Sequence, residues 1–303
     1  MAYMKQGCWL PDEDKEGLTY TDTFDDFGEV EAGRYHLYIS YACPFAHRPY
    51  LVHSLMGLGD AISISSMAAN RHSCGWAFDE TDIDPLFGYS HLQQLYTQAK
   101  PDFTGRITVP VLWDKKRNVI ASNDSASIAQ WFNDEWQSIA TKPNNLSPTD
   151  QRDVIDELCE WLNEQINVGV YKAGFAKEQA SYDSAFDDVF KALDELDIRL
   201  STQRFLHGNT LTMSDVRLIP SLLRFDSVYY FHFKLNNKRI QDYANLWGYL
   251  LDAMQIPEVV ATFKEVHLKQ HYFYSHNFIN PTRIVPKGPV IDWFQTHDRS
   301  NKF

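Results

Sequence analysis

The chain has 303 residues, of which 44% are hydrophobic, and its formal net charge at pH 7 is −12. A chain of this length usually folds into more than one domain. The negative average field repels polyanions, which excludes nucleic acid as an expected partner. No run of about 18 apolar residues predicts a membrane span, and we expect a cytoplasmic protein.

Cysteine usage predicts a reducing compartment and no disulfide scaffold. The four cysteines are Cys8, Cys43, Cys74 and Cys159, and no two are spaced as C-x-x-C, which excludes a zinc ribbon and a dithiol redox motif. His267 and His271 are four residues apart, but no H-E-x-x-H pattern and no third ligand accompany them. Packing is therefore favoured over metal binding, and no metal site is predicted.

The first predicted elements follow a polar segment. Residues 1–34 are acidic and rich in turn residues, which predicts an irregular N-terminal arm. Residues 35–40 are aromatic and β-branched and predict a strand, and residues 62–65 predict a second one. Between them, Cys43-Pro44 opens a helical pattern, because proline is well tolerated in the first helical position.

The next elements complete a sheet. Residues 66–105 form a long polar and aromatic insertion, whereas residues 108–113 predict a strand and residues 118–121 its hairpin partner. A helix is predicted over residues 122–133. The order β-α-β and then β-β-α predicts an α/β thioredoxin-like domain over residues 35–141, with a mixed sheet between helices.

The second half of the chain has helical periodicity. Residues 142–150 are rich in proline and asparagine and predict a linker. Apolar residues then recur at helical spacing over residues 151–275, which predicts an all-α domain. Within it, Thr212 and Asp215 have the spacing of a capping box at the start of a helix. Residues 276–303 contain three prolines and predict an irregular C-terminal tail.

Cys43 is the candidate nucleophile. A cysteine at a helix N-terminus faces unpaired N–H groups and the positive end of the helix dipole, and both favour the thiolate. His47 and Arg48, one turn later, add positive potential. Residue 46 is alanine, so no resolving cysteine follows, and an external thiol such as glutathione must complete a reaction cycle. The alternative is a buried cysteine that only packs.

Two further segments suit a peptide ligand. The bond between Val109 and Pro110 can be cis, which would leave backbone groups for a ligand that adds as a strand. Asp124 and Ser125 at a predicted helix start offer a carboxylate, a hydroxyl and free N–H groups to a ligand with amino and carboxylate groups. The alternatives are an edge-strand proline and ordinary N-capping.

The segment Ser40-Tyr-Ala-Cys43-Pro-Phe-Ala-His-Arg48 is similar to the C-P-W-A-H-R motif of Xi-class glutathione transferases, the S-glutathionyl-hydroquinone reductases. The resemblance covers about residues 35–290. Its other parts are residues 75–78, 103–114, 168–176, 224–229, 243–249, 271–272 and 275–281. Phe45 stands where the motif has tryptophan, and Asp124 stands where the family has glutamate.

The resemblance implies a glutathione transferase fold and a two-step reaction. Cys43 attacks the sulfur of a glutathionyl-hydroquinone, the hydroquinone leaves, and a second glutathione resolves the mixed disulfide and releases oxidised glutathione. Glutathione would then be a co-substrate, and the family implies a homodimer. The implied catalytic residues are Cys43, Tyr171 and Tyr272. The implied glutathione-binding residues are Trp76, Arg106, Val109, Asp124 and Ser125.

Two alternatives remain open at this point. A broader thiol transferase or dehydroascorbate reductase, like those of the Omega class, would use the same cysteine on mixed-disulfide substrates. A non-enzymatic assembly module would keep the fold and not need the reactive Cys43.

Overall fold

The computed structural model describes residues 3–10, 23–71 and 74–303. The chain forms two compact units. The first consists of Met1–Pro143 together with Val266–Ser275, and the second consists of Asn144–Glu265 together with His276–Phe303.

The first unit is built on a four-stranded mixed sheet in the order β4-β3-β6-β7. Its strands are β3 (Tyr35–Ile39), β4 (Ile62–Ser66), β6 (Val111–Asp114) and β7 (Val119–Ser122). β3 pairs in parallel with β4 and antiparallel with β6, so it is an inner strand, and all five of its residues are buried. This burial explains its run of aromatic and aliphatic residues.

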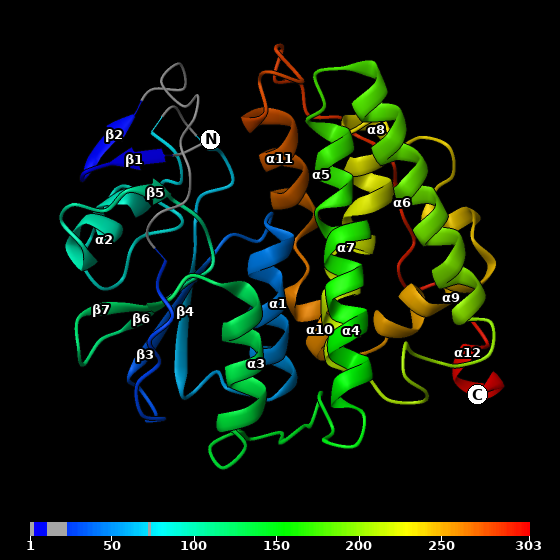
Figure 1. The fold of residues 1–303 in the computed structure, drawn as a ribbon, viewed down its shortest axis with the longest axis horizontal. Helices are drawn as coiled ribbons and strands as arrows, with labels where there is room; N and C mark the ends of the chain where they lie inside the picture. Colours follow the sequence, from blue (N-terminus) through cyan, green and yellow to red (C-terminus); the bar gives the residue numbers. More distant parts are fainter. Residues whose placement is uncertain (1–2, 11–22, 72–73) are drawn as a thin grey trace. The chain divides into compact units, whose positions relative to one another are not determined.

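Three helices accompany this sheet: α1 (Pro44–Leu55), α2 (Leu92–Ala99) and α3 (Ser125–Glu135). α1 and α3 lie side by side on one side of the strands, and α2 lies on the other (Figure 1). Pro44 is in the first turn of α1, as the sequence predicts, and the helix continues through Pro49 to Leu55. The sheet and its helices thus place the starts of α1 and α3 in one compact unit.

A second, small sheet corrects the prediction of an irregular arm. β1 (Tyr3–Lys5) pairs antiparallel with β2 (Cys8–Leu10) and with β5 (Gly105–Arg106). The pairing of Tyr3 with Arg106 joins segments about a hundred residues apart, which local sequence patterns do not reveal. The middle of the predicted arm, residues 11–22, lies outside the described residues.

The second unit is helical (Figure 1). Its helices are α4 (Arg152–Leu162), α5 (Gly169–Gly174), α6 (Gln179–Arg199), α7 (Met213–Arg224), α8 (Tyr230–His232), α9 (Ala244–Ala253), α10 (Pro257–Thr262) and α12 (Arg299–Lys302). Short helical turns η2 (Asn163–Asn167), η3 (Phe225–Tyr229) and η4 (Ile240–Asp242) join several of them. η2 and η3 are π-helical, a rare form that often marks functional regions.

The capping box predicted at α7 is present. Asp215 Oδ2 accepts hydrogen bonds from the backbone N–H and the hydroxyl of Thr212 at 2.8 and 2.9 Å. Asp215 Oδ1 accepts from the Leu206 N–H at 3.1 Å and from the Tyr249 hydroxyl at 2.9 Å. Asp215 is fully buried, so these four donors offset part of the cost of removing its carboxyl group from water.

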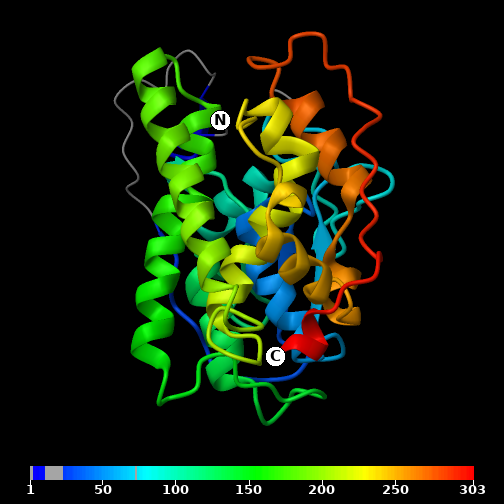
Figure 2. The same ribbon diagram turned by 90° about the vertical axis from the view of Figure 1, so that its right-hand side faces the viewer.

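α11 (Glu265–Ser275) differs from the expectation of a helical domain that runs to residue 275. From Val266 onward it groups with the first unit, not with the helices that precede it. The tail that follows belongs to the second unit and ends, as Figure 2 shows, in the short red helix α12, which packs on α9. Arg299 fastens its end through hydrogen bonds to the carbonyls of Leu200 and Gln203, both at 2.6 Å.

Within the described ranges 3–10, 23–71 and 74–303, no helix has the length and apolarity required to cross a membrane.

Candidate functional site

Cys43 caps the N-terminus of α1 with its own side chain. Its backbone is extended, with φ −78° and ψ 118°, and its Sγ accepts a hydrogen bond from the Ala46 N–H at 3.5 Å. The same sulfur lies 3.7 Å from the Val109 carbonyl oxygen, to which the thiol donates. The Cys43 residue is half-buried, not enclosed in the core. This position at the positive end of a helix favours negative charge on sulfur.

The Val109–Pro110 peptide bond is cis, as its sequence context suggested. Val109 is buried, and its carbonyl is the group that faces the Cys43 sulfur. Next to it, the Thr108 carbonyl accepts a hydrogen bond from the Tyr96 hydroxyl at 2.9 Å. The loop before β6 is therefore held beside the candidate nucleophile by interactions on both sides.

The start of α3 carries the second candidate cluster. Asp124 is the N-cap, and its Oδ1 accepts from the Ser127 N–H at 2.7 Å. The buried Ser125 hydroxyl accepts from Arg48 Nη1 at 3.2 Å. Arg48 comes from α1 and is itself buried, so its cation links the two helix starts. Two helix N-termini with a guanidinium between them form a region that attracts an anion.

Trp76 is held against α11. Its ring is stacked on His271, with centroids 4.9 Å apart and planes at 8°, and only 8% of the residue is exposed. His271 Nδ1 lies 2.8 Å from the Ala69 carbonyl oxygen, which orients the imidazole. Sequence reasoning missed this role of His271, because the two rings are almost two hundred residues apart.

The tyrosines predicted to be catalytic lie in different units. Tyr272 is in α11 within the first unit, is almost fully buried, and meets His271 edge-on at 5.7 Å. Tyr171 is in α5 within the second unit, edge-on to Phe175 at 5.5 Å and to Phe233 at 5.3 Å. The first unit therefore contains every predicted site residue except Tyr171, and the roles of all of them remain predictions.

A histidine pair lies in the same aromatic cluster as Tyr171. His232 Nε2 is 3.2 Å from His276 Nδ1, and both residues are buried. Burial is the main cause that lowers the pKa of His232 from 6.5 to about 4. His276 also packs against Phe175 and Phe233. Sequence analysis did not single out this pair.

In the part of the chain that the structure describes, no three His, Cys, Asp or Glu side chains are grouped so that they could hold a metal ion. His267 and His271, the pair considered from sequence, have other contacts. His267 meets Tyr41 edge-on at 5.2 Å, and His271 is bonded to the Ala69 carbonyl.

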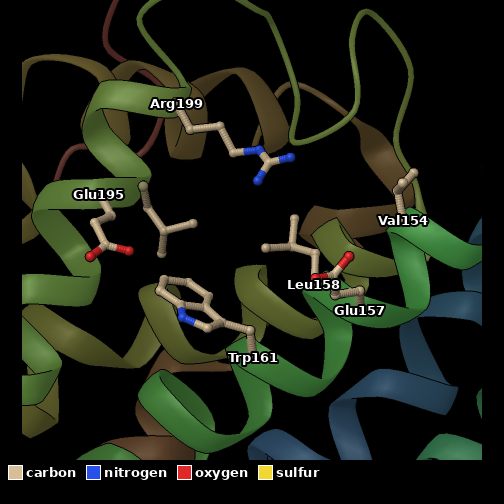
Figure 3. Close-up of a pocket in the computed structure, with 7 residues that line it drawn as sticks. Val154, Glu157, Leu158, Trp161, Glu195 and Arg199 are labelled. Carbon is tan, nitrogen blue, oxygen red and sulfur yellow. The ribbon is translucent and has the colours of Figure 1, made fainter.

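A surface pocket of about 470 Å³ lies in the helical unit. Figure 3 shows Arg199 and Glu195 from α6 facing Trp161 and Leu158 from α4 across it. None of the predicted site residues lines this pocket. The candidate thiol chemistry is therefore not located there.

Known families and proteins match this chain over most of its length. Residues 42–135 match the family model of the glutathione S-transferase N-terminal domain, and residues 179–251 match that of the C-terminal domain. The glutathionyl-hydroquinone reductase YqjG of Escherichia coli is 43% identical over 97% of this chain and 90% of its own. The glutathionyl-hydroquinone reductase PcpF of Sphingobium chlorophenolicum is 41% identical over 86% of this chain and 84% of its own.

Solved structures agree with these relatives. A Xi-class glutathione transferase from Natrialba magadii has a TM-score of 0.95 and 38% identity, and the match covers 99% of this chain and 97% of that one. The glutathione-bound structure of YqjG has a TM-score of 0.92 and 40% identity, with 99% and 100% covered. The predicted fold, a thioredoxin-like domain followed by a helical domain, is confirmed. The chain belongs to the Xi-class glutathione transferases, the family that contains the glutathionyl-hydroquinone reductases.

Proposed function

We propose that this protein is a glutathione-dependent oxidoreductase that reduces S-glutathionyl-hydroquinones to hydroquinones. The observation that carries the proposal is the Cys43 sulfur at the N-terminus of α1, 3.7 Å from the Val109 carbonyl, in a chain of this family. A half-buried cysteine at a helix start has the charge preference that a nucleophile needs and is not enclosed in the core.

The reaction has two balanced steps. In the first, the Cys43 thiolate attacks the sulfur of the substrate and forms an S–S bond, while the bond from that sulfur to the ring carbon breaks. The ring carbon takes the electron pair and a proton, and the hydroquinone leaves. In the second, the thiolate of a free glutathione attacks the mixed disulfide, releases oxidised glutathione and restores Cys43. One thioether sulfur and one thiol sulfur are thus oxidised to a disulfide as the aromatic ring carbon is reduced.

Glutathione is the co-substrate, and its γ-glutamyl end binds at the start of α3. Asp124 takes the amino group, and Ser125 with the free N–H groups of the helix takes the α-carboxylate. Val109 offers backbone groups to the cysteinyl part of the ligand. Trp76 packs over the tripeptide, and Arg106 binds the remaining carboxylate.

Tyr171 and Tyr272 contact the quinol oxygens and assist the proton transfer to the ring. The aromatic surroundings of Tyr171, which include Phe175 and Phe233, provide an apolar environment suited to an aromatic substrate. A homodimer in the cytoplasm and a domain boundary at residues 142–150 complete the proposal.

A direct assay tests this function. The purified protein is incubated with a glutathionyl-hydroquinone and glutathione, and free hydroquinone and oxidised glutathione are measured together. Equal amounts of both are expected, and Cys43→Ser should form neither, whereas the matched variant Cys159→Ser should keep the activity because Cys159 is buried in α4. If the wild-type protein forms no hydroquinone, the proposal is wrong.

Substrate comparison and the Cys43→Ser variant distinguish this function from its two alternatives. An Omega-like thiol transferase would turn over small mixed disulfides or dehydroascorbate faster than the glutathionyl-hydroquinone. An assembly module would retain its biological role in the Cys43→Ser variant. The mass of the protein after exposure to oxidised glutathione should show a single glutathione adduct, and peptide mapping should locate it at Cys43.

A further inference from the structure

The segment Ala69–Asn70–Arg71, which follows β4, is fastened to α11. The Ala69 carbonyl oxygen is bonded to His271 Nδ1 at 2.8 Å, and Asn70 Oδ1 accepts from Gln270 Nε2 at 3.0 Å. The Arg71 N–H donates to Ser275 Oγ at 2.9 Å. Three hydrogen bonds along one helix fix the backbone from which the Arg71 side chain extends.

The Arg71 side chain lies beside Trp76. Its guanidinium carbon is 5.8 Å from the centroid of the Trp76 ring, which is within cation–π distance. His271 covers one face of the same ring. Arg71 therefore stands next to the aromatic residue that the proposed function places over glutathione.

Arg71 differs from several other arginines of the protein in its ion pairing. Arg34 and Arg204 are paired with Asp114 and Asp252 at 2.6 and 2.7 Å. Arg71 is half-buried, and in the described part of the chain no carboxylate lies within ion-pair distance of it. Burial and the nearby positive charge of Arg106 lower the pKa of Arg71. A partly buried cation without a carboxylate partner is costly unless a ligand supplies an anion.

The ligand of the proposed function supplies that anion. Glutathione carries one carboxylate at its γ-glutamyl end, assigned above to the start of α3, and a second on its glycyl end. We propose that Arg71, together with Arg106, binds the glycyl carboxylate and makes the protein selective for ligands that carry it. This inference rests on the proposed function and adds a specificity-determining residue that its motifs did not contain.

A binding cycle tests the proposal without turnover. The ligands are S-methylglutathione, which cannot form a disulfide with Cys43, and its glycyl ethyl ester, which lacks only the second negative charge. Dissociation constants are measured by calorimetry for the wild type and for Arg71→Gln. The variant should bind S-methylglutathione about tenfold more weakly, the range of one charge-assisted hydrogen bond. It should bind the ester within about twofold of the wild type, because no charge remains for Arg71 to recognise.

Two variants serve as controls. Arg71→Lys keeps the charge and should recover most of the affinity for S-methylglutathione, since a lysine can still form an ion pair with a carboxylate. Lys115→Gln removes one positive charge from an exposed turn of the same unit and should leave both dissociation constants unchanged. Melting temperatures establish that the variants fold.

Equal weakening of both ligands in Arg71→Gln would overturn the proposal, because the residue would then support the fold of the site and not the glycyl charge. So would unchanged binding of S-methylglutathione. Turnover of a glutathionyl-hydroquinone is measured separately with the wild type. Its absence would contradict the proposed function, whereas the difference between the two ligands would still decide the role of Arg71.

Discussion

The helix starts of the two units use the same backbone groups in opposite ways. At α7 the N-terminus is closed, because Asp215 is fully buried and accepts four hydrogen bonds. At α1 the cap is a sulfur that accepts from the Ala46 N–H at 3.5 Å. At α3 the cap is the exposed Asp124, bonded to Ser127.

This difference separates stability from binding. A helix start that is fully satisfied by its own chain contributes to folding, since its N–H groups have no further partner to seek. A helix start with a weak cap keeps its dipole and its N–H groups for a ligand. The helical unit has the first kind at α7, and the thioredoxin-like unit has the second kind at α1.

The largest expected effect is the loss of turnover when the weak cap of α1, Cys43, is replaced. Cys43→Ser should lower the turnover of a glutathionyl-hydroquinone by about 10³-fold or more, because serine is a poor nucleophile at neutral pH. The same change should leave the free energy of unfolding equal or raise it by up to about 1 kcal/mol, since serine is a better N-cap. Urea denaturation and the turnover assay measure the two quantities. Marked destabilisation would show that the Cys43 sulfur has a packing role and is not merely a weak cap.

Removing the closed cap of α7 should instead lower the stability strongly. Asp215→Ala leaves the Leu206 N–H, the Thr212 N–H and the Tyr249 hydroxyl buried without their acceptor, which should cost about 3–5 kcal/mol of unfolding free energy. Urea denaturation measures it. The control Asp153→Ala removes a carboxylate from the first turn of α4, where it is exposed, and should change stability by less than about 1 kcal/mol. A small effect of Asp215→Ala would mean that other residues close α7.

Each unit contains a buried histidine whose pKa is lowered. His36 in β3 contacts the Ser63 and Ser65 hydroxyls, and His232 contacts His276. Burial is the main cause that lowers both pKa values to about 4. Between pH 6.5 and 4 the unfolded chain therefore binds more protons, and stability falls as the pH decreases through this window. Each histidine should contribute up to about 3 kcal/mol to that loss.

Denaturation at several pH values between 7 and 4 checks this prediction. His36→Gln should flatten the pH dependence of the transition of the first unit, and His232→Gln that of the second. If both variants retain the full slope, groups other than these histidines cause it.

The smallest expected effect is at α3, whose exposed cap Asp124 is proposed to serve both the helix and the ligand. Asp124→Ala should cost about 1 kcal/mol of stability, because it removes the hydrogen bond to the Ser127 N–H. It should also raise the KM for glutathione several-fold, since the proposed site places the ligand amine on this carboxylate. Asp124→Asn keeps the cap and should separate the two effects: stability recovers while the KM stays raised. Recovery of both would assign Asp124 to capping alone.

Local signals made much of this structure predictable. Cys43-Pro44, the Thr212–Asp215 box and the strand ahead of Cys43 are read correctly because cap chemistry and side-chain period depend on neighbouring residues. β1, β2 and β5 were missed. The strands of the β1–β2 hairpin are too short for a period to show, and β5 exists only through its long-range pairing with β1.

The contacts of Trp76 were missed for two reasons. His271 stacks on it from a distant part of the sequence, and no local pattern indicates that the nearby Arg71 lies against its ring. The π-helical turns η2 and η3 likewise lie within runs that read as continuous helix. The family motifs therefore predict a reacting sulfur but do not indicate which residues pack around Trp76.

The return of the chain to its first unit through Val266–Ser275 has a consequence for protein engineering. A fragment that ends at the linker would lack the partners of Ala69 and Trp76, and a chimera joined there would receive both from its donor. Exchange of the C-terminal half between relatives would thus also replace the residues that pack on Trp76 and hold Ala69. A chimera should therefore take α11 and Met1–Pro143 from the same parent protein.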